Sequence, residues 1–552
     1  MINDTSGYRS LRCICCDAPS EDFRQWRAPP LQRVIHVSFC GIRAAICEQS
    51  HCRRRHRAVS LGVEISSLRI LLRMNRCPKH LTVQWARAVL SRALLMGVLL
   101  VPPYAHAFEV EMGAVTVQDT FVTPTWTVVS FIQPFSTTPV VVALPTNDGG
   151  DPATLRIRNV TSTGFEIVPT EPNANDGPHL AMNTAYLAVE PGSHVLPDGN
   201  RLIALQHSTT SFANRFIGTS WDTVGFPDSF VGNPAVLAAI QTTANESQNP
   251  PSTSSVPFMD VGLRNANPAS FQVTLERAES TAGSVTFAEQ IGVIAIENGV
   301  NLTFTDLLGT TVQLQSLLTP RNVRGWDNGC YTNNYGAAFA ATPLSVASLN
   351  SRTGNNGGWA RRCGQSAAGL GLTVDEDIDN DAERNHQPEM AGIIATSAAF
   401  HVNFGVDLLV SKHYNLVADP YNGTSNPKSI PNADIGYTIG VVNRGSGSPD
   451  VDTLVVTDDI SAGIRLCVSA ICQAGGPIVF DPSASPVPPG VALGPVEYSN
   501  NGGATYTYAP IPDADGFDTA VDAVRITMSG TMAGIAPSGA PSFELRMAAR
   551  VN

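Results

Sequence analysis

Short runs of hydrophobic residues dominate the middle of the chain, and they predict strands. The run 140–146 (VVVALPT) is short and rich in valine, whereas 165–171 (FEIVPTE) and 271–276 (FQVTLE) alternate hydrophobic and polar positions. Such alternation is typical of a strand with one buried face. No segment of 108–404 repeats hydrophobic positions at i, i+3, i+4 and i+7 over the roughly ten residues that a helix needs. The pattern predicts an all-β protein of antiparallel β-sandwiches.

The same pattern occurs three times along the chain. The copies begin at Trp126, Trp221 and Trp326, which are 95 and 105 residues apart. Each ends in a short hydrophobic strand, with the sequences AYLAVE from 185, GVIAIE from 292 and GIIATS from 392. These spacings exceed the roughly 20–50 residues of a solenoid repeat, so each copy is predicted to be its own small domain. The expected domain ranges are 108–210, 211–311 and 312–404.

The first copy carries a family resemblance. Its segments VVSFIQPFSTTPVVVAL (128–144), RNVTSTGFEIV (158–168) and AYLAVE resemble the H-type lectin domain, and the second copy keeps a weaker version. The resemblance implies a six-stranded β-sandwich, assembly as a trimer, and binding of N-acetylgalactosamine-type sugars between subunits. The chain departs from the family in the closing strand, where Tyr186, Val293 and Ile394 replace a tryptophan.

Arginine and glutamate recur in the three copies and are candidate ligand-binding residues. The arginines precede a strand in each copy, and the glutamates lie near its end: Arg158, Arg264 and Arg362, and Glu171, Glu276 and Glu376. A sugar-binding interpretation uses them as polar contacts to hydroxyl groups. The alternative is an internal arginine–carboxylate pair that braces two strands, and we favour it, because binding residues usually lie on loops that differ between copies.

The third copy contains the densest acidic segment, 374–389 (VDEDIDNDAERNHQPE). Calcium needs six to eight oxygen ligands, and closely spaced carboxylates supply them. The candidate calcium ligands are Asp375, Asp377, Asp379, Asp381 and Glu383. The segment does not match an EF-hand, because Asn380 and His386 occupy the positions of its glycine and its final glutamate. A solvated acidic loop is the favoured alternative.

The repeat stops near residue 405, and a different domain is predicted for 405–552. Lys412 and the segments NPKSIPNADIGYTI (426–439), VVNRG (441–445) and VTDDIS (456–461) resemble the immunoglobulin-like conserved repeat domain of bacterial surface proteins. The resemblance implies a β-sandwich that serves as a spacer or a docking domain. Farther on, NNGG at 500–503 predicts a hairpin turn, and the last ten residues, FELRMAARVN, predict a final strand.

The region before the repeats has the features of a signal peptide. A hydrophobic run at 94–101 (LLMGVLLV) follows basic residues and precedes Ala105 and Ala107, an A-x-A cleavage pattern. Cleavage after Ala107 and a start at Met74 are predicted, which leaves no transmembrane span in the exported chain. The preceding segment 1–73 is interpreted as an upstream translation artefact or a disordered stretch, and a Cys/His metal module is its alternative. The expected location is the periplasm, the cell surface or the medium.

Charge and cysteine content change the picture after residue 107. The whole chain has 35 Lys and Arg and 47 Asp and Glu, and residues 1–107 hold 16 and 6 of them, so the remainder has a formal charge of −22. Such a chain is not expected to bind nucleic acid, which requires clustered basic residues. Four cysteines remain, and they predict the disulfides Cys330–Cys363 and Cys467–Cys472, with free thiols as the alternative.

No catalytic motif occurs in the sequence: it contains neither H-E-x-x-H nor G-x-S-x-G. We therefore expect a non-catalytic exported protein without a cofactor other than calcium, which binds a glycan or another surface ligand in adhesion. The alternatives are a structural protein of the envelope or an appendage, and then a carbohydrate-processing enzyme. The copies are expected to form a homo-oligomer or to reproduce a trimer within one chain.

Overall fold

The computed structural model of the chain describes residues 107–119, 125–172, 175, 179–246 and 256–552. It also describes two short paired strands, β1 (Glu64–Ile65) and β2 (Leu68–Arg69). The predicted signal peptide before Ala107 and the rest of segment 1–73 lie outside the described residues. The described residues from Ala107 to Asn552 belong to one compact unit. The predicted all-β class is confirmed, because the described helices are two 3-10 turns, η1 (Trp326–Asn328) and η2 (Pro482–Ala484).

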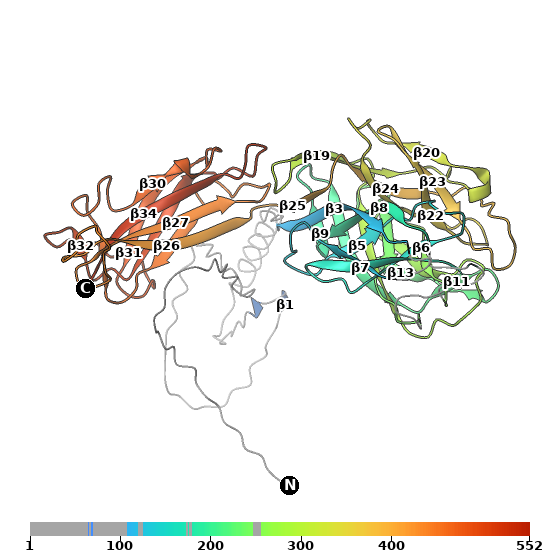
Figure 1. Cartoon of the computed structure of the whole chain (residues 1–552), viewed down its shortest axis with the longest axis horizontal. Coiled ribbons are helices and arrows are strands. Elements are labelled where there is room, and N and C mark those ends of the chain that lie inside the picture. Colours follow the sequence, from blue (N-terminus) through green and yellow to red (C-terminus); the bar gives the residue numbers. More distant parts are fainter. Residues whose placement is uncertain are drawn as a thin grey trace, which may run out of the picture. The chain divides into compact units, whose positions relative to one another are not determined.

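The first module is a sandwich of two sheets. Its four-stranded sheet has the order β25–β3–β8–β5, formed by Phe400–Phe404, Phe108–Val117, Met182–Val189 and Val140–Ala143. Its second sheet has the order β4–β7–β6, formed by Thr127–Ser130, Gly164–Thr170 and Thr154–Arg158. Figure 1 shows β25 beside β3. Strand β25 comes from the end of the third repeat, so the two ends of the repeat region meet in one sheet.

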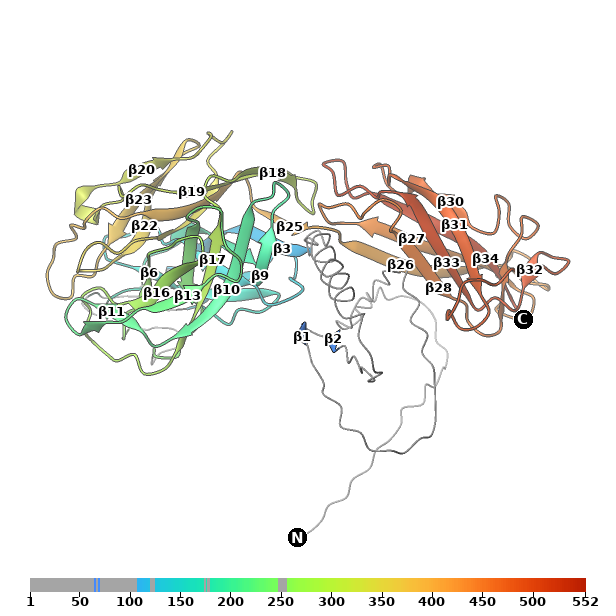
Figure 2. The same ribbon diagram turned by 180° about the vertical axis from the view of Figure 1, so that it is seen from behind.

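The second module repeats this plan. Its first sheet has the order β14–β17–β10–β9, formed by Ala235–Ile240, Glu289–Ile296, Arg201–Thr209 and Gly192–Val195. Figure 2 shows β17, β10 and β9 of this sheet together. Its second sheet has the order β12–β11–β16–β13, with β15 also paired to β16; the strands are Gly218–Thr219, Phe212–Asn214, Ser270–Glu276, Asp222–Gly225 and Asp260–Arg264.

The third module has the same pair of sheets. The first has the order β18–β19–β24–β21, formed by Asn301–Thr305, Thr311–Leu318, Ala391–Thr396 and Leu344–Leu349. The second has the order β20–β23–β22, formed by Tyr331–Asn334, Gly369–Asp375 and Trp359–Gln365.

The strand pairings move the module boundaries that the sequence suggested. The expected ranges placed hairpin β9–β10 in the first module and split hairpin β18–β19 between the second and third. Instead, each hairpin pairs with the sheet that follows it, and β25 completes the first module rather than the third. The error arose because Trp221 and Trp326 each follow the first hairpin of their unit, whereas hydrogen bonding groups that hairpin with the strands that come after it.

The three modules share a central core in addition to their own. In β8, Leu187 faces the central core, whereas Tyr186 faces the core between the two sheets of the first module. In β17, Ile294 and Val293 divide in the same way. The modules contact one another in cyclic order, β5 with β17, β14 with β24, and β21 with β8. The modules are therefore not independent domains, because each buries the outer face of its neighbour's sheet.

The C-terminal region forms a separate sandwich with its own core, which confirms the expected sandwich architecture (Figure 1). One sheet has the order β26–β27–β34–β29–β32, with β30 also paired to β34; the strands are Leu408–Ala418, Asp434–Asn443, Ser542–Val551, Ile464–Cys467, Phe517–Asp518 and Val479–Asp481. The other has the order β28–β33–β31, formed by Val455–Asp459, Ala523–Gly530 and Val491–Ser499. Strand β34 is the predicted final strand.

Both predicted disulfides are confirmed. Cys330 joins Cys363 within the third module, and Cys467 joins Cys472 in the C-terminal sandwich. Their Cα atoms are 5.6 and 5.8 Å apart, within the usual range for a disulfide. Among the residues that the structure describes, no helix has the length and hydrophobicity needed to cross a bilayer.

Candidate functional site

The repeated tryptophan of each module carries an arginine on its face. The guanidinium carbon of Arg158 lies 4.0 Å from the centre of the Trp126 ring, and that of Arg264 lies 4.1 Å from Trp221. In the third module Arg384 takes this place, 4.1 Å from Trp326. The stacks hold each indole against a cation, an interaction worth about 0.5–2 kcal/mol.

Strand register shows that the three candidate arginines are not equivalent. Arg158 pairs across the sheet with Glu166, and Arg264 pairs with Gln272 at the same position of the second module. The corresponding pair of the third module is Gly364 with Gly371, because a bulge follows Arg362. Arg362 lies one step before this position, and its side chain donates to the carbonyl oxygen of Asn183 in the first module. The predicted equivalence of Arg362 with the other two is wrong.

The candidate glutamates likewise occupy two different positions. Glu276 ends β16, and by register it corresponds to Thr170 and Asp375, so Glu171 and Glu376 each lie one residue farther along. Glu276 accepts a hydrogen bond of 2.6 Å from Nε of Arg352, which reaches across from the third module. Glu376 pairs with His386, and Glu171 is buried. The three glutamates are therefore buried, and Glu276 and Glu376 form pairs inside the protein rather than contacts at its surface.

The candidate calcium ligands at the end of β23 and in the loop after it do not surround one point. Asp375 is fully buried and pairs with Arg361 at 2.5 Å and with Arg384 at 3.0 Å. Burial raises the pKa of Asp377 to about 7, and its carboxylate accepts a hydrogen bond from the backbone amide of Glu279 in the second module. The described residues contain no group of three or more His, Cys, Asp or Glu that could hold a metal ion.

The other three predicted calcium ligands lie at the surface of this loop. Asp381 and Glu383 are exposed and Asp379 is half-buried, while the backbone amide of Asp379 donates to Asp377. The favoured alternative, a solvated acidic loop, describes only the middle of the segment, residues 379–385. Residues 374–377 at its start and Glu389 at its end are buried, so the geometry gives the calcium interpretation no support.

A buried histidine is held between two carboxylates in the same region. Nδ1 of His386 contacts Glu376, and Nε2 lies 3.1 Å from Glu389. Glu389 also accepts hydrogen bonds from the hydroxyl groups of Ser351 and Thr353. Burial opposes the charged imidazolium, but the two carboxylates outweigh burial and raise the pKa of His386 from 6.5 to about 9.

This pKa predicts how the stability of the three-module body (the modules within 107–404) depends on pH. A histidine whose pKa is raised in the folded state stabilises it fully below the unfolded pKa of 6.5, and this stabilisation disappears as pH rises through about 9. We expect the free energy of unfolding to fall by up to about 3 kcal/mol between pH 7 and 9.5. Urea titrations at each pH measure it, and His386→Gln is expected to flatten the curve. An unchanged slope in this variant would contradict the assignment.

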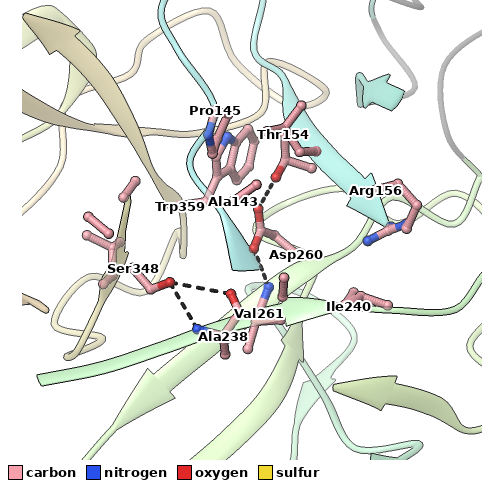
Figure 3. Close-up of a pocket in the computed structure, with 15 residues that line it drawn as sticks. Ala143, Pro145, Thr154, Arg156, Ala238, Ile240, Asp260, Val261, Ser348 and Trp359 are labelled. Atoms are coloured by element: carbon pink, nitrogen blue, oxygen red, sulfur yellow. Dashed lines mark hydrogen bonds between the residues drawn. The ribbon is translucent and has the colours of Figure 1, made fainter. Parts of the chain in front are cut away.

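A small cavity among the described residues lies where the modules meet, and it is too small for a ligand. Figure 3 shows it at the junction of all three modules, where Ser348 is directed at the backbone of Ala238 and Thr154 at the carboxylate of Asp260. Burial raises the pKa of Asp260, which favours its protonated form. The volume of about 30 Å³ matches a single water molecule.

A larger cavity lies between the second and third modules and has a volume of about 240 Å³. We call it the junction pocket, and it is lined by Asn233, Arg264, Asn265 and Ala266 of the second module and by Leu318, Arg321, Asn350, Ser351, Arg352 and Met390 of the third. The side chains of Asn233 and Arg321 are exposed, so the pocket reaches the surface. Of the six predicted ligand-binding residues, Arg264 alone lines it.

The walls of the junction pocket are held by contacts between the modules. The amide of Asn350 accepts from the backbone N–H of Val236 at 2.9 Å and donates to the carbonyl oxygen of the same residue at 2.6 Å. Arg352 is fixed by Glu276 at 2.6 Å. Asn350 and Arg352 were not predicted from the sequence, because they lie on a loop of one module and meet a strand of another. Their only local signal was the polar loop 350–356 (NSRTGNN) that follows β21.

No family model matches the chain, and no solved structure matches it. A curated phosphoserine aminotransferase from Lactobacillus helveticus (strain DPC 4571) is 28% identical over 144 residues, which cover 22% of this chain and 36% of that protein. The chain thus spans little more than a third of the relative it matches. This likeness does not establish a family or an enzymatic activity.

Proposed function

We propose that the chain is an exported, non-catalytic protein that binds a glycan in the junction pocket. The observation that carries this proposal is a surface cavity between two modules whose polar walls are held in place before any ligand arrives. Preorganised polar groups in a concave site are what small polar ligands require for orientation and specificity.

The lining suits a sugar in both of its chemical aspects. Asn233, Asn265 and Arg321 offer donors and acceptors for hydroxyl groups, whereas Leu318 and Met390 offer hydrophobic surface for the C–H face of a sugar ring. The volume of about 240 Å³ is below the roughly 300 Å³ at which pockets for drug-sized ligands begin. We therefore propose that one terminal sugar residue occupies the pocket, rather than a long stretch of oligosaccharide.

The shared central core favours a second candidate function, that of a structural building block. Three sandwiches that bury one another's sheets, followed by an immunoglobulin-like sandwich, suit a spacer in the envelope or in an appendage. This function needs no ligand, so a binding experiment separates it from the first.

A glycan array with the exported chain tests the proposed function. Asn233→Trp is expected to fill the pocket mouth and to reduce binding at least tenfold, since the site holds about one sugar. Val231→Trp is the matched control on the same loop, because Val231 is 96% exposed and lies outside the lining, and its binding is expected to stay unchanged. Equal binding by both variants would place the glycan outside the junction pocket, and no binding by the parent chain would favour the structural role.

A further inference from the structure

The junction pocket has an unbalanced charge. Three of its ten lining residues are arginines, Arg264, Arg321 and Arg352, and none is a carboxylate. The surrounding chain is acidic, with a formal charge of −22 after residue 107. A cluster of arginines therefore does not follow from the general composition of the protein.

Part of this excess positive charge arises because Arg264 is paired with a neutral residue, Gln272, instead of a carboxylate. In the first module, Nε of Arg158 lies 2.6 Å from Oε2 of Glu166, which neutralises its charge. At the same register position of the second module, Nε of Arg264 donates to the amide oxygen of Gln272 at 2.9 Å. The geometry of the pair is kept while its negative charge is removed.

Of the other two arginines of the pocket, one has a carboxylate partner and the other has none. Arg352 is neutralised by Glu276 at 2.6 Å. Within the described ranges, neither Arg264 nor Arg321 makes an ion pair with a carboxylate. The pKa of Arg264 is lowered by burial and by the positive charge of Arg352. An anion in the pocket would relieve this repulsion.

We propose that the junction pocket binds a carboxylated sugar residue, of the uronic or sialic acid type, with its carboxylate against Arg264 and Arg321. This inference rests on the proposed glycan-binding function and specifies the class of sugar. A guanidinium group presents paired N–H donors that match the two oxygens of a carboxylate, which gives direction as well as charge. Leu318 and Met390 remain available for the ring, and Asn233 and Asn265 for its hydroxyl groups.

Calorimetry with the full exported chain tests the proposal, with methyl glucuronoside, methyl glucoside and inorganic sulfate as probes. We expect the glucuronoside to bind at least tenfold more tightly than the glucoside, and the difference to shrink as salt rises from 50 to 500 mM, since added ions screen the charges. Gln272→Glu should give Arg264 the partner that Arg158 already has, and should lower affinity for the glucuronoside at least tenfold. Arg321→Gln, an exposed substitution, should lower it in the same direction.

The matched control is Glu166→Gln, which makes the reciprocal change in the first module and leaves the junction pocket intact. Its affinity for the glucuronoside is expected to equal that of the parent chain. Equal affinities for glucuronoside and glucoside would overturn the carboxylate assignment and leave glycan binding in place. Binding of sulfate without either glycoside would overturn both, as would the absence of binding by all three probes. Thermal unfolding of each variant verifies that lost affinity is not lost folding.

Discussion

Substitution of Arg361 by methionine is expected to lower the free energy of unfolding of the three-module body by about 3–5 kcal/mol. The side chain is fully buried, and it joins the third module to the first. Its guanidinium group pairs with Asp375 at 2.5 Å and donates to the carbonyl oxygens of Thr146 and Asp151, each at 2.7 Å. Methionine keeps much of the side-chain volume but removes the hydrogen-bond donors. The carboxylate and carbonyl oxygens then stay buried without partners, and this lowers the free energy of unfolding.

Tryptophan fluorescence during urea unfolding measures this effect selectively. Four tryptophans lie in the three-module body, namely Trp126, Trp221, Trp326 and Trp359, and residues 405–552 contain none. Arg158→Met is the control, because the Arg158–Glu166 pair is partly exposed and lies within one module. Its loss is expected to cost about 1 kcal/mol. Equal destabilisation by the two substitutions would show that the contact between modules adds nothing.

Substitution of Phe400 by alanine is expected to lower the same free energy of unfolding by about 3–5 kcal/mol. Phe400 begins β25, pairs with Met112 of β3, and has no exposed surface. Its ring centre lies 5.0 Å from that of Phe304 in the third module. The substitution therefore opens a cavity in the central core at the place where the end of the repeat region closes onto its beginning.

Calorimetric unfolding separates this closure from a general loss of stability. The transition of the three-module body is expected to move to lower temperature, whereas that of the C-terminal sandwich, which has its own core, should stay in place. Phe287→Ala is the control, since Phe287 is 61% exposed, and no shift is expected for it. If Phe400→Ala left the transition of the three-module body unchanged, the packing of β25 against β3 would not contribute to the stability of the folded chain.

The hydrophobic pattern predicted the strands but not the surfaces that cover them. Runs such as AYLAVE and GVIAIE carry hydrophobic residues on both faces, which is typical of a strand buried on both sides. One face meets the second sheet of its own module, and the other meets the central core. The residues that cover the second face belong to another module, roughly a hundred residues away, so no local pattern could predict them.

The candidate site was predictable only in part for the same reason. Arg264 was found because the arginine recurs at a fixed place before a strand. Arg321 and Arg352 stand in loops of the third module without an equivalent in the pattern, and they reach the pocket because the modules pack together. The replacement of Glu166 by Gln272 is visible in the sequence, but its meaning depends on a strand register that only the structure supplies.

By itself, the sequence predicted the all-β class, the threefold repetition and the two disulfides from short-range periodicity and the placement of the cysteines. The resemblance of residues 405–552 implied the separate C-terminal sandwich. The tertiary structure alone decided the module boundaries, the closure through β25 and the junction pocket. Each of these depends on pairing or packing between residues far apart along the chain. Periodicity shows that a face must be buried, and only the folded chain shows what buries it.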